Sequence, residues 1–265
     1  MNIKEIYRTL FSKKIRKFIY TIKNLLIGNF FIIHKNSYAD DGLATNHITD
    51  FMKDKKFIES YNLGRQTGAL ENHPGDIHFR AYIACYCAKH ATKVEGDFVE
   101  CGVGKGIIST IICNYLNFDK IKKNFYLIDT FNGIPVSKIL NENEIKTVNL
   151  LNKIHFNNNY YDHIVNNFKN FTNVNIVQGE IPAVFKKLYI DKISFLHLDM
   201  NNGYAEIESI KFFFPKISVG GLVLLDDYSY DEMFRNLKNC WDEYAKENNL
   251  SILALPTGQG LIIKI

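Results

Sequence analysis

Short apolar runs alternate with longer amphipathic stretches over residues 96–265. The runs are rich in β-branched and aromatic side chains, as in buried strands. Five of them predict strands, at 97–101, 124–130, 173–179, 193–199 and 221–227. The stretches 107–116 and 204–214 have apolar residues every three or four positions, as in a helix. Strands that alternate with helices predict an α/β fold with a parallel, doubly wound sheet.

The C-terminal end departs from this alternation. Residues 251–255 and 261–265 have strand patterns, and the residues between them, Pro256 to Gly260, are typical of a turn. A hairpin after a series of strands and helices adds an antiparallel strand to the sheet. The predicted architecture is therefore a doubly wound, Rossmann-like sheet that ends in an antiparallel hairpin.

The first 35 residues have a different pattern. Apolar residues spaced by three and four alternate with eight Lys and Arg residues and one acid, Glu5, which predicts a basic amphipathic helix. Such a helix binds an anionic membrane surface or a partner helix, or it packs on the chain's own body or on a second subunit. The longest apolar run, residues 25–33, is too short to span a bilayer. We expect three segments: this helix at 1–35, a helical lead-in or cap at 36–95, and the sheet domain at 96–265.

Charge separates the same segments. The whole chain of 265 residues has a net charge of +4, but residues 1–35 alone carry +7. The other 230 residues contain 24 basic and 27 acidic side chains, a net charge of −3, which gives no support for a nucleic-acid-binding surface.

The five cysteines lack metal-site spacing, so reduced thiols in the cytoplasm are the simplest interpretation. The basic first segment would suit a position at the inner face of the membrane.

The strongest local motif lies where the first strand of the sheet domain ends. Glu100 and Cys101 are followed by Gly102, Gly104 and Gly106, just before a predicted helix. Glycines allow a ligand to approach the backbone, and a helix N-terminus adds exposed N–H groups and positive potential. This G-x-G-x-G spacing predicts a ligand-binding turn. The alternative is a tight strand-to-helix turn without a ligand.

The next strand supplies an acid for the same ligand. Asp129 ends that strand 27 residues after Gly102, where a carboxylate can accept hydrogen bonds from ribose hydroxyls at the switch point of the sheet. A glycine turn followed by this acid favours an adenosine-containing ligand. The terminal hairpin then favours S-adenosylmethionine (SAM) over a nicotinamide dinucleotide, whose fingerprint would also need a glycine at Ile107.

Acids follow two later strands. Asp199 comes directly after Leu198, at the end of the strand at 193–199, and Asp226 and Asp227 come after Leu225. Because the carboxyl ends of parallel strands meet at one edge of a sheet, the three carboxylates can converge there, and hard oxygen ligands of this kind suit Mg²⁺. The alternative is that they are solvated or cap the following helices.

Four motifs in this order resemble the macrocin O-methyltransferase (TylF/MycF) family. They are Glu100–Val103, Asp129–Pro135, Leu196–Asp199 and Gly220–Tyr228, and together they cover about half of the chain. The resemblance implies a class I enzyme that uses SAM and a divalent metal ion to methylate sugar hydroxyls of natural products. It therefore implies a Rossmann-like methyltransferase domain at 96–265.

The resemblance also implies roles for individual residues. The expected cofactor-binding residues are Glu100, Gly102, Val103, Gly104, Ser109, Asp129, Thr130 and Gly179. The expected metal ligands are Asp199, Asp226 and Asp227. The expected catalytic residues are Asp199 and a histidine that follows the second motif, either His155 or His163, of which we favour His155. His197 lies within a strand and is expected in the core or behind the metal ligands, whereas His78 and Arg80 could contact either ligand.

Three departures from the family pattern are present, and one is the C-terminal hairpin with Pro256, Thr257 and Gly258, where family members vary. The paired glycine of the first motif is Gly106-Ile107 here, and the D-x-D-x-Y segment becomes Asp199-Met200-Asn201-Asn202-Gly203-Tyr204. An amide thus replaces the second acid of that segment.

The sequence predicts a cytoplasmic SAM-dependent methyltransferase with a sugar or glycosylated small molecule as acceptor, destined for a bacterial surface polysaccharide or a natural product. One rival is methyl transfer to an amine or a phosphorylated small molecule without a metal. Another is a non-catalytic binding or assembly subunit that keeps the fold and docks through residues 1–35. A homo-oligomer is compatible with each of these.

Overall fold

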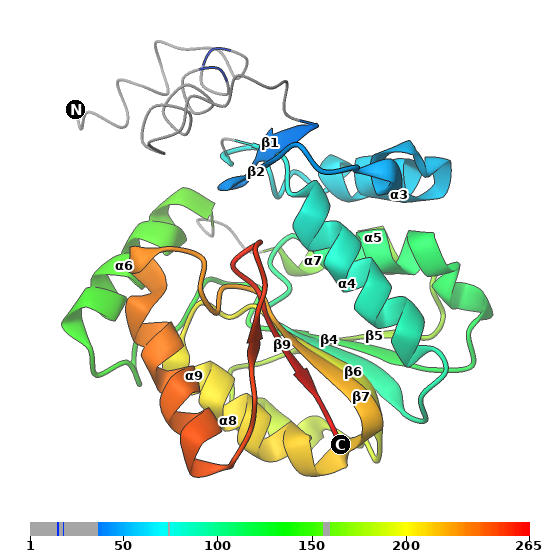
Figure 1. Cartoon of the computed structure of the whole chain (residues 1–265). Helices are drawn as coiled ribbons and strands as arrows, with labels where there is room; N and C mark the ends of the chain where they lie inside the picture. The colour runs from blue at the N-terminus through cyan, green and yellow to red at the C-terminus, as the bar shows by residue number, and fades with distance from the viewer. Residues whose placement is uncertain (1–14, 16–17, 19–36, 74, 156–159) are drawn as a thin grey trace.

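The computed structural model describes residues 15, 18, 37–73, 75–155 and 160–265 of the chain (Figure 1). The basic helix predicted over residues 1–35 lies outside the described residues, apart from Ile15 and Phe18. Within the described ranges, none of the helices is both long enough and apolar enough to cross a membrane.

A seven-stranded sheet forms the centre of the fold (Figure 1). Its strands are β3 (Asp97–Cys101), β4 (Phe125–Asp129), β5 (Val174–Gln178), β6 (Ile193–Leu198), β7 (Ile217–Leu225), β8 (Leu253–Ala254) and β9 (Gly260–Ile263). They are ordered β5-β4-β3-β6-β7-β9-β8. The pairs from β5 to β7 are parallel, and β9 is antiparallel to both β7 and β8. The predicted doubly wound sheet with a C-terminal antiparallel hairpin is confirmed.

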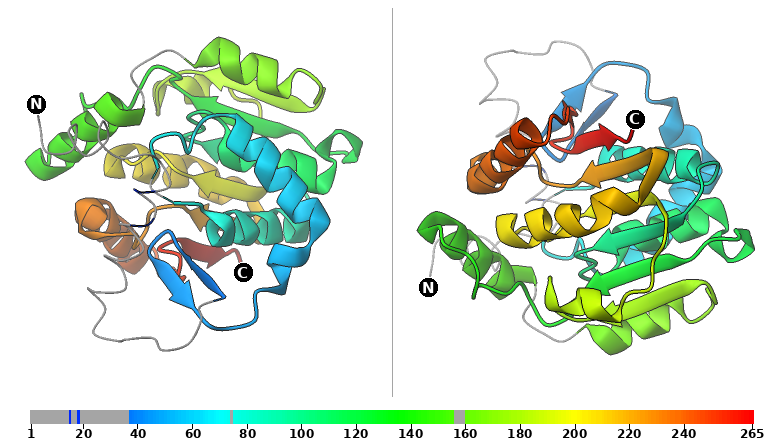
Figure 2. Two further views of the ribbon diagram at one scale, coloured as in Figure 1. Left: turned by 90° about the horizontal axis from the view of Figure 1, so that it is seen from above. Right: turned by 90° about the horizontal axis from the view of Figure 1, so that it is seen from below.

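Helices cover both faces of this sheet (Figure 2). The helices are α3 (Lys55–Gln66), α4 (His78–Ala91), α5 (Ile107–Leu116), α6 (Glu142–His155), α7 (Tyr161–Phe168), α8 (Gly203–Phe213) and α9 (Arg235–Glu247). Short 3-10 helices lie between them: η1 (Asp50–Lys53), η2 (Phe118–Lys120), η3 (Ala183–Lys187), η4 (Phe214–Lys216) and η5 (Glu232–Phe234). Buried residues of α3, α4, α5 and α7 form one core, and those of α8 and α9 form a second. Two cores on opposite faces are what a doubly wound sheet requires.

The central strands explain why the sheet is buried on both faces. All six residues of β6 and the last four of β3 are buried, and most of them are apolar. Strand order reverses between β3 and β6, because the chain runs outward from β3 to β5 and then returns to β6 on the other side. Ligands bind at such a reversal, outside the carboxyl ends of the strands. The fold therefore places the glycine turn and Asp199 on the same crevice.

The segment before the sheet is packed into the first core. It contains a small hairpin, β1 (Tyr38–Asp40) and β2 (Leu43–Thr45), followed by α3 and α4. Asp54 caps α3 by accepting hydrogen bonds from the N–H groups of Lys56 and Phe57. Gly64 lets α3 approach α5, since a Cβ there would overlap the side chain of Ile111. Residues before β3 are thus joined to the sheet by close packing.

Candidate active site

The glycine turn after β3 depends on backbone conformations that favour glycine. Gly102, Gly104 and Gly106 have φ angles of 85°, 52° and 77°. A Cβ on Gly102 would overlap the carbonyl group of Asp199, so the ends of β3 and β6 can approach only because this residue has no side chain. Gly106 directly precedes α5. The turn is therefore fixed by sterics at both of its ends.

The carboxylate of Asp129 holds this turn from the neighbouring strand. Its Oδ2 accepts hydrogen bonds from the N–H groups of Val103 at 2.6 Å and Gly104 at 2.8 Å, and its Oδ1 accepts one from Phe131 at 2.7 Å. Burial raises the pKa of Asp129, and these N–H groups oppose that rise by stabilising the charged form. The acid thus organises the turn in addition to facing the cavity beside it.

A cavity lies at the carboxyl edge, beyond the ends of β3, β4, β5 and β6. Eight of the residues predicted for the site line it: Gly102, Val103, Gly104, Asp129, Thr130, His155, Gly179 and Asp199. Further lining residues that the sequence did not single out include Asn72, Lys105, Phe131, Lys138, Tyr160 and Tyr204. Phe131 lies inside the second motif, Asp129–Pro135, and this position could have indicated that it lines the cavity. Asn72 comes from the loop before α4, and nothing in the local pattern pointed to it.

His155 reaches the cavity from the last residue of α6. The hydroxyl of Tyr160, which also lines the cavity, donates a hydrogen bond to the carbonyl oxygen of His155 at 2.6 Å. Lys105 lies over the ring of Tyr160, with its Nζ 5.3 Å from the ring centroid. His163, the other candidate base, is on α7 and is not among the described lining residues.

Two predicted cofactor residues, Glu100 and Ser109, are buried and are not among the described residues that line the cavity. Glu100 is only 2% exposed, and its Oε1 lies 3.1 Å from Nδ1 of His197. Ser109 lies in α5 and donates a long hydrogen bond, 3.4 Å, to the carbonyl of Gly106. Their direct contact with a cofactor remains a prediction.

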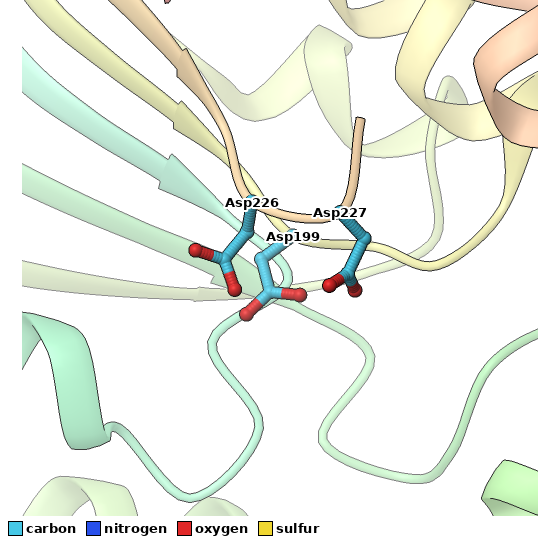
Figure 3. Close-up of side chains that lie close together, drawn as sticks. All are labelled: Asp199, Asp226 and Asp227. Carbon is cyan, nitrogen blue, oxygen red and sulfur yellow. The ribbon is translucent and has the colours of Figure 1, made fainter. Parts of the chain in front are cut away.

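Three carboxylates converge at the ends of β6 and β7. Oxygen atoms of Asp199, Asp226 and Asp227 all lie within 4.8 Å of one another. Figure 3 shows the three side chains extending from the strand ends toward the same space. Asp199 also lines the cavity, so this acid cluster of Asp199, Asp226 and Asp227 borders the glycine turn.

Arg80 of α4 enters the acid cluster from the lead-in segment. Its Nη2 lies 2.9 Å from Oδ2 of Asp226 and 2.6 Å from Oδ1 of Asp227, and it also donates to the carbonyl of Asp226. The guanidinium is 4.6 Å from the ring centroid of Tyr230, and its Nε is 4.0 Å from Asp41. A buried arginine of the first half of the chain therefore neutralises two acids of the second half.

A second buried cation stands behind Asp226. His197 is fully buried between Glu100, at 3.1 Å, and Asp226, at 3.5 Å. Burial alone would lower the pKa of His197, but the two carboxylates outweigh it and raise that pKa to about 10. Gln259 donates to the same Oδ1 of Asp226 at 2.8 Å. The two carboxylates therefore favour the charged form of His197, which supports the cluster from the core.

The three acids differ in their pKa values because the cations are shared unequally. Burial raises the pKa of Asp199, and the charges of Asp226 and Asp227 raise it further. Burial also raises the pKa of Asp227, to about 7, against the opposing effect of Arg80. For Asp226, Arg80 and His197 together outweigh burial and hold its pKa below its usual range. Asp199, which faces the cavity, thus retains a proton most readily.

The donor set of the cluster fits a hard divalent cation. All three side chains offer carboxylate oxygens, the ligands that Mg²⁺ prefers. Among the described residues, Oδ2 of Asp199 and Oδ2 of Asp227 receive no hydrogen bond. Asp199 and Asp227 would therefore offer oxygens directly, whereas both oxygens of Asp226 already face Arg80, His197 or Gln259.

The altered D-x-D-x-Y segment forms the loop between β6 and α8. Asn201 has a φ of 55° and donates to Oδ1 of Asp199 at 3.2 Å. Asn202 caps α8 by accepting from the N–H of Ala205, and it donates to the carbonyl of Pro135. Glu206 accepts from the N–H of Met200 at 3.2 Å. The amides here orient Asp199 and close the loop; they do not restore a second acid.

The strand order, the glycine turn and the cavity at the switch point define a Rossmann-like methyltransferase fold. The family model of macrocin O-methyltransferase (TylF) matches residues 75–253, and the chain belongs to that family. The resemblance stated from the four motifs is therefore confirmed.

A curated relative is the demethyldecarbamoylnovobiocin O-methyltransferase of Streptomyces niveus, 27% identical over 169 residues. The match covers 60% of this chain, and the chain spans only 62% of that relative's length.

Solved structures show the same fold. The O-methyltransferase NovP has a TM-score of 0.61 and 22% identity, over 70% of this chain and 79% of that one. A putative caffeoyl-CoA O-methyltransferase from Staphylococcus aureus has a TM-score of 0.56 and 13% identity, over 82% and 98%. The S-adenosylhomocysteine-bound methyltransferase PaMTH1 of Podospora anserina has a TM-score of 0.52 and 12% identity, over 80% and 88%. At these identities the likeness concerns the fold.

Proposed function

We propose that this chain is a SAM-dependent O-methyltransferase that acts on a hydroxyl of a sugar or a glycosylated small molecule. One observation carries the proposal: a single cavity borders the glycine turn, Asp129, Asp199 and His155. A methyl donor held by the turn and an acceptor near the acid cluster would thus share one cavity. Family membership and the S. niveus relative support the same activity.

The cofactor would lie along the edge made by β3, β4 and β5. Gly102 and Gly104 leave the backbone open to the methionine part, and Asp129 with Thr130 would contact the ribose. Gly179 follows β5 and lines the same cavity, and its N–H donates to the carbonyl of Asp129 at 2.9 Å. These residues bind and orient; none of them has to change protonation state.

The acceptor hydroxyl must lose its proton as its oxygen bonds to the methyl carbon and the bond from that carbon to sulfur breaks. Asp199 and His155 both line the cavity and are the groups we assign to that proton. His155 is the second acceptor for the proton.

A divalent ion such as Mg²⁺ would be held by Asp199, Asp226 and Asp227. Bound there, it would lower the pKa of the acceptor hydroxyl and orient it. This chain's own part is to hold the three carboxylates within reach of one another and of the cavity.

We also propose that the protein works in the cytoplasm, with residues 1–35 at the inner membrane face, on a sugar for a surface polysaccharide or a natural product. The +7 charge of that segment supports this location. Co-sedimentation with anionic vesicles should fall on deletion of residues 1–35 and on addition of salt. Equal sedimentation without the segment would exclude the membrane role.

Calorimetry with S-adenosylhomocysteine is the first test of the activity. Binding by the folded full-length chain is expected, and no binding would overturn the proposal. Turnover is then measured with a panel of sugar hydroxyl, amine and phosphorylated acceptors, with and without EDTA. Methylation of amines alone, or cofactor binding without any turnover, would favour an N-methyltransferase or a non-catalytic subunit.

The candidate base needs its own measurement. His155→Ala should lower kcat by about 10²-fold or more, the range typical of general-base removal. His163→Ala, on the neighbouring helix α7, is the matched control and should leave kcat unchanged. Equal kcat for wild type and His155→Ala would leave Asp199 as the base.

A further inference from the structure

The acid cluster contains a cation of its own, the guanidinium of Arg80. One nitrogen, Nη2, lies 2.9 Å from an oxygen of Asp226 and 2.6 Å from an oxygen of Asp227. A metal ion that bridges those two oxygens would occupy the same position between them, because Mg²⁺ binds carboxylate oxygens at about 2.1 Å. The guanidinium and a bridging ion cannot both be there.

We propose that Arg80 competes with a divalent cation for the carboxylates of Asp226 and Asp227, and so sets how tightly the acid cluster binds metal. The proposal rests on the proposed function only in assigning the cluster to the methyl-transfer site. Arg80 acts through the metal ligands, so it is a positioning residue.

The surroundings of Arg80 keep it in place. Its side chain is 8% exposed, it stacks on Tyr230 at 4.6 Å, and it donates to the backbone carbonyl of Asp226. The hydroxyl of Tyr230 donates to Asp41 at 2.8 Å, and Asp41 faces Nε of Arg80. Displacing the guanidinium would break these contacts and leave a buried charge without partners, which is costly.

The remaining oxygens define a smaller site on the cavity side. Oδ2 of Asp199 and Oδ2 of Asp227 receive no hydrogen bond from the described part of the chain. Mg²⁺ with two such ligands would keep most of its water shell, and ions held this way bind weakly.

Metal binding to the full-length protein tests the proposal directly, by calorimetric titration with Mg²⁺ and with Mn²⁺. Arg80→Gln should bind either ion about tenfold more tightly than the wild type, since a competing buried charge is removed. Arg80→Lys keeps the charge and should stay within a few-fold of the wild type. Asp199→Asn in the Arg80→Gln background should abolish the gain. Equal or weaker binding by Arg80→Gln would overturn the proposal.

The matched control is Arg65→Gln. Arg65 lies on α3 and pairs with Asp76 at 3.4 Å, away from the cluster. Its substitution should leave metal affinity unchanged. A gain equal to that of Arg80→Gln would show that net charge, rather than competition at Asp226 and Asp227, sets the affinity, and would also overturn the proposal.

A second measurement covers the case in which Arg80→Gln folds poorly. Mn²⁺ should raise the Tm of Arg80→Gln more than that of the wild type, because an ion that binds only the folded state stabilises it. Tyr230→Leu removes the ring under the guanidinium and should raise metal affinity by a few-fold. Unchanged affinity in Tyr230→Leu together with an equal Tm shift in Arg80→Gln would overturn the proposal. Binding of S-adenosylhomocysteine is followed in parallel, so that failure of the cofactor assignment is seen separately.

Discussion

At the glycine turn, the carboxylate of Asp129 is held by backbone N–H groups, whereas in the acid cluster Asp226 and Asp227 are held by the side chain of Arg80. The backbone N–H donors are part of the turn. They are uncharged, so they need no partner of opposite charge elsewhere. Side-chain cations come from another element of the chain. In the acid cluster they do not fully offset the negative charges, since the charges of Asp226 and Asp227 still raise the pKa of Asp199. Burial raises the pKa of both acids, but the backbone N–H groups oppose that rise at Asp129, whereas the charges of Asp226 and Asp227 add to it at Asp199.

The largest expected effect is a fall in stability as pH rises, and it comes from the cluster side. The folded state raises the pKa of Glu206 from 4.5 to about 8, that of Asp227 from 3.8 to about 7, and that of His197 from 6.5 to about 10. Between pH 5 and 9 the folded protein therefore binds more protons than the unfolded chain. Each extra bound proton lowers the free energy of unfolding by about 1.4 kcal/mol for every unit that the pH rises.

Urea unfolding at pH 5, 7 and 9 measures this slope. Glu206→Gln should flatten it between pH 5 and 8, because the buried group that accepts from Trp241 no longer titrates. Glu208→Gln, on the same helix, is the control and should leave the slope unchanged. A wild-type stability that rises from pH 5 to 9 would contradict the charge balance described for the cluster.

On the side of the turn, Gly102→Ala should have the largest effect of a single substitution. Its φ of 85° and the overlap of a Cβ with the carbonyl of Asp199 should cost about 2–4 kcal/mol of unfolding free energy and abolish S-adenosylhomocysteine binding. Gly42→Ala is the control, since Gly42 has a φ of 75° but open space around its Cβ position. It should cost about 1 kcal/mol. Equal losses of unfolding free energy in the two variants would show that steric overlap at Gly102 does not contribute.

Asp129→Asn should have the next largest effect. The amide can accept through one oxygen only, so N–H groups of the turn lose a partner, at a cost of about 1–3 kcal/mol. Cofactor-product affinity should fall by about tenfold or more. Denaturation and calorimetry measure both quantities. Asp119→Asn, at an exposed aspartate before β4, should change neither.

Asp199→Asn should distinguish the acid cluster from the glycine turn most clearly. It should change the free energy of unfolding least of these substitutions. Replacing a half-buried acid that faces two others removes repulsion, so the free energy of unfolding at pH 8 should stay the same or rise by about 1 kcal/mol. Turnover should be lost nonetheless. A loss of stability as large as that of Asp129→Asn would show that both acids are held in the same way.

The parts of the fold that could be predicted are those with a local signature. The five parallel strands and the helices at 107–116 and 204–214 follow from apolar periodicity, and β3, α5 and α8 begin within a residue of their predicted positions. Helices α6 and α9 received no prediction, because polar residues dominate both segments. Their positions depend on packing, as when Trp241 of α9 is buried against Glu206.

The residues of the candidate site also fall into those with a local sequence signature and those without one. Strand ends alone indicated that Asp199, Asp226 and Asp227 could converge, because parallel strands share an edge. The pairing of Arg80 with two of these acids had no local signal, although Arg80 had been considered as a ligand contact. Glu100 was expected beside the cofactor from its motif position, and its side chain contacts His197 of the adjacent strand; its contact with a cofactor remains a prediction.

The pairing of Arg80 with Asp227 also bears on the order in which the site is completed. These two residues are separated by 147 positions in the chain, whereas Gly104 and Asp129 are separated by 25. Contacts between distant positions carry a larger loop-closure cost and form later than local ones. A chain emerging from the ribosome would therefore form the contact of Asp129 with the glycine turn before the pairing of Arg80 with the acid cluster. Pulsed hydrogen exchange during refolding should protect the N–H groups of Val103 and Gly104 before that of Asp226.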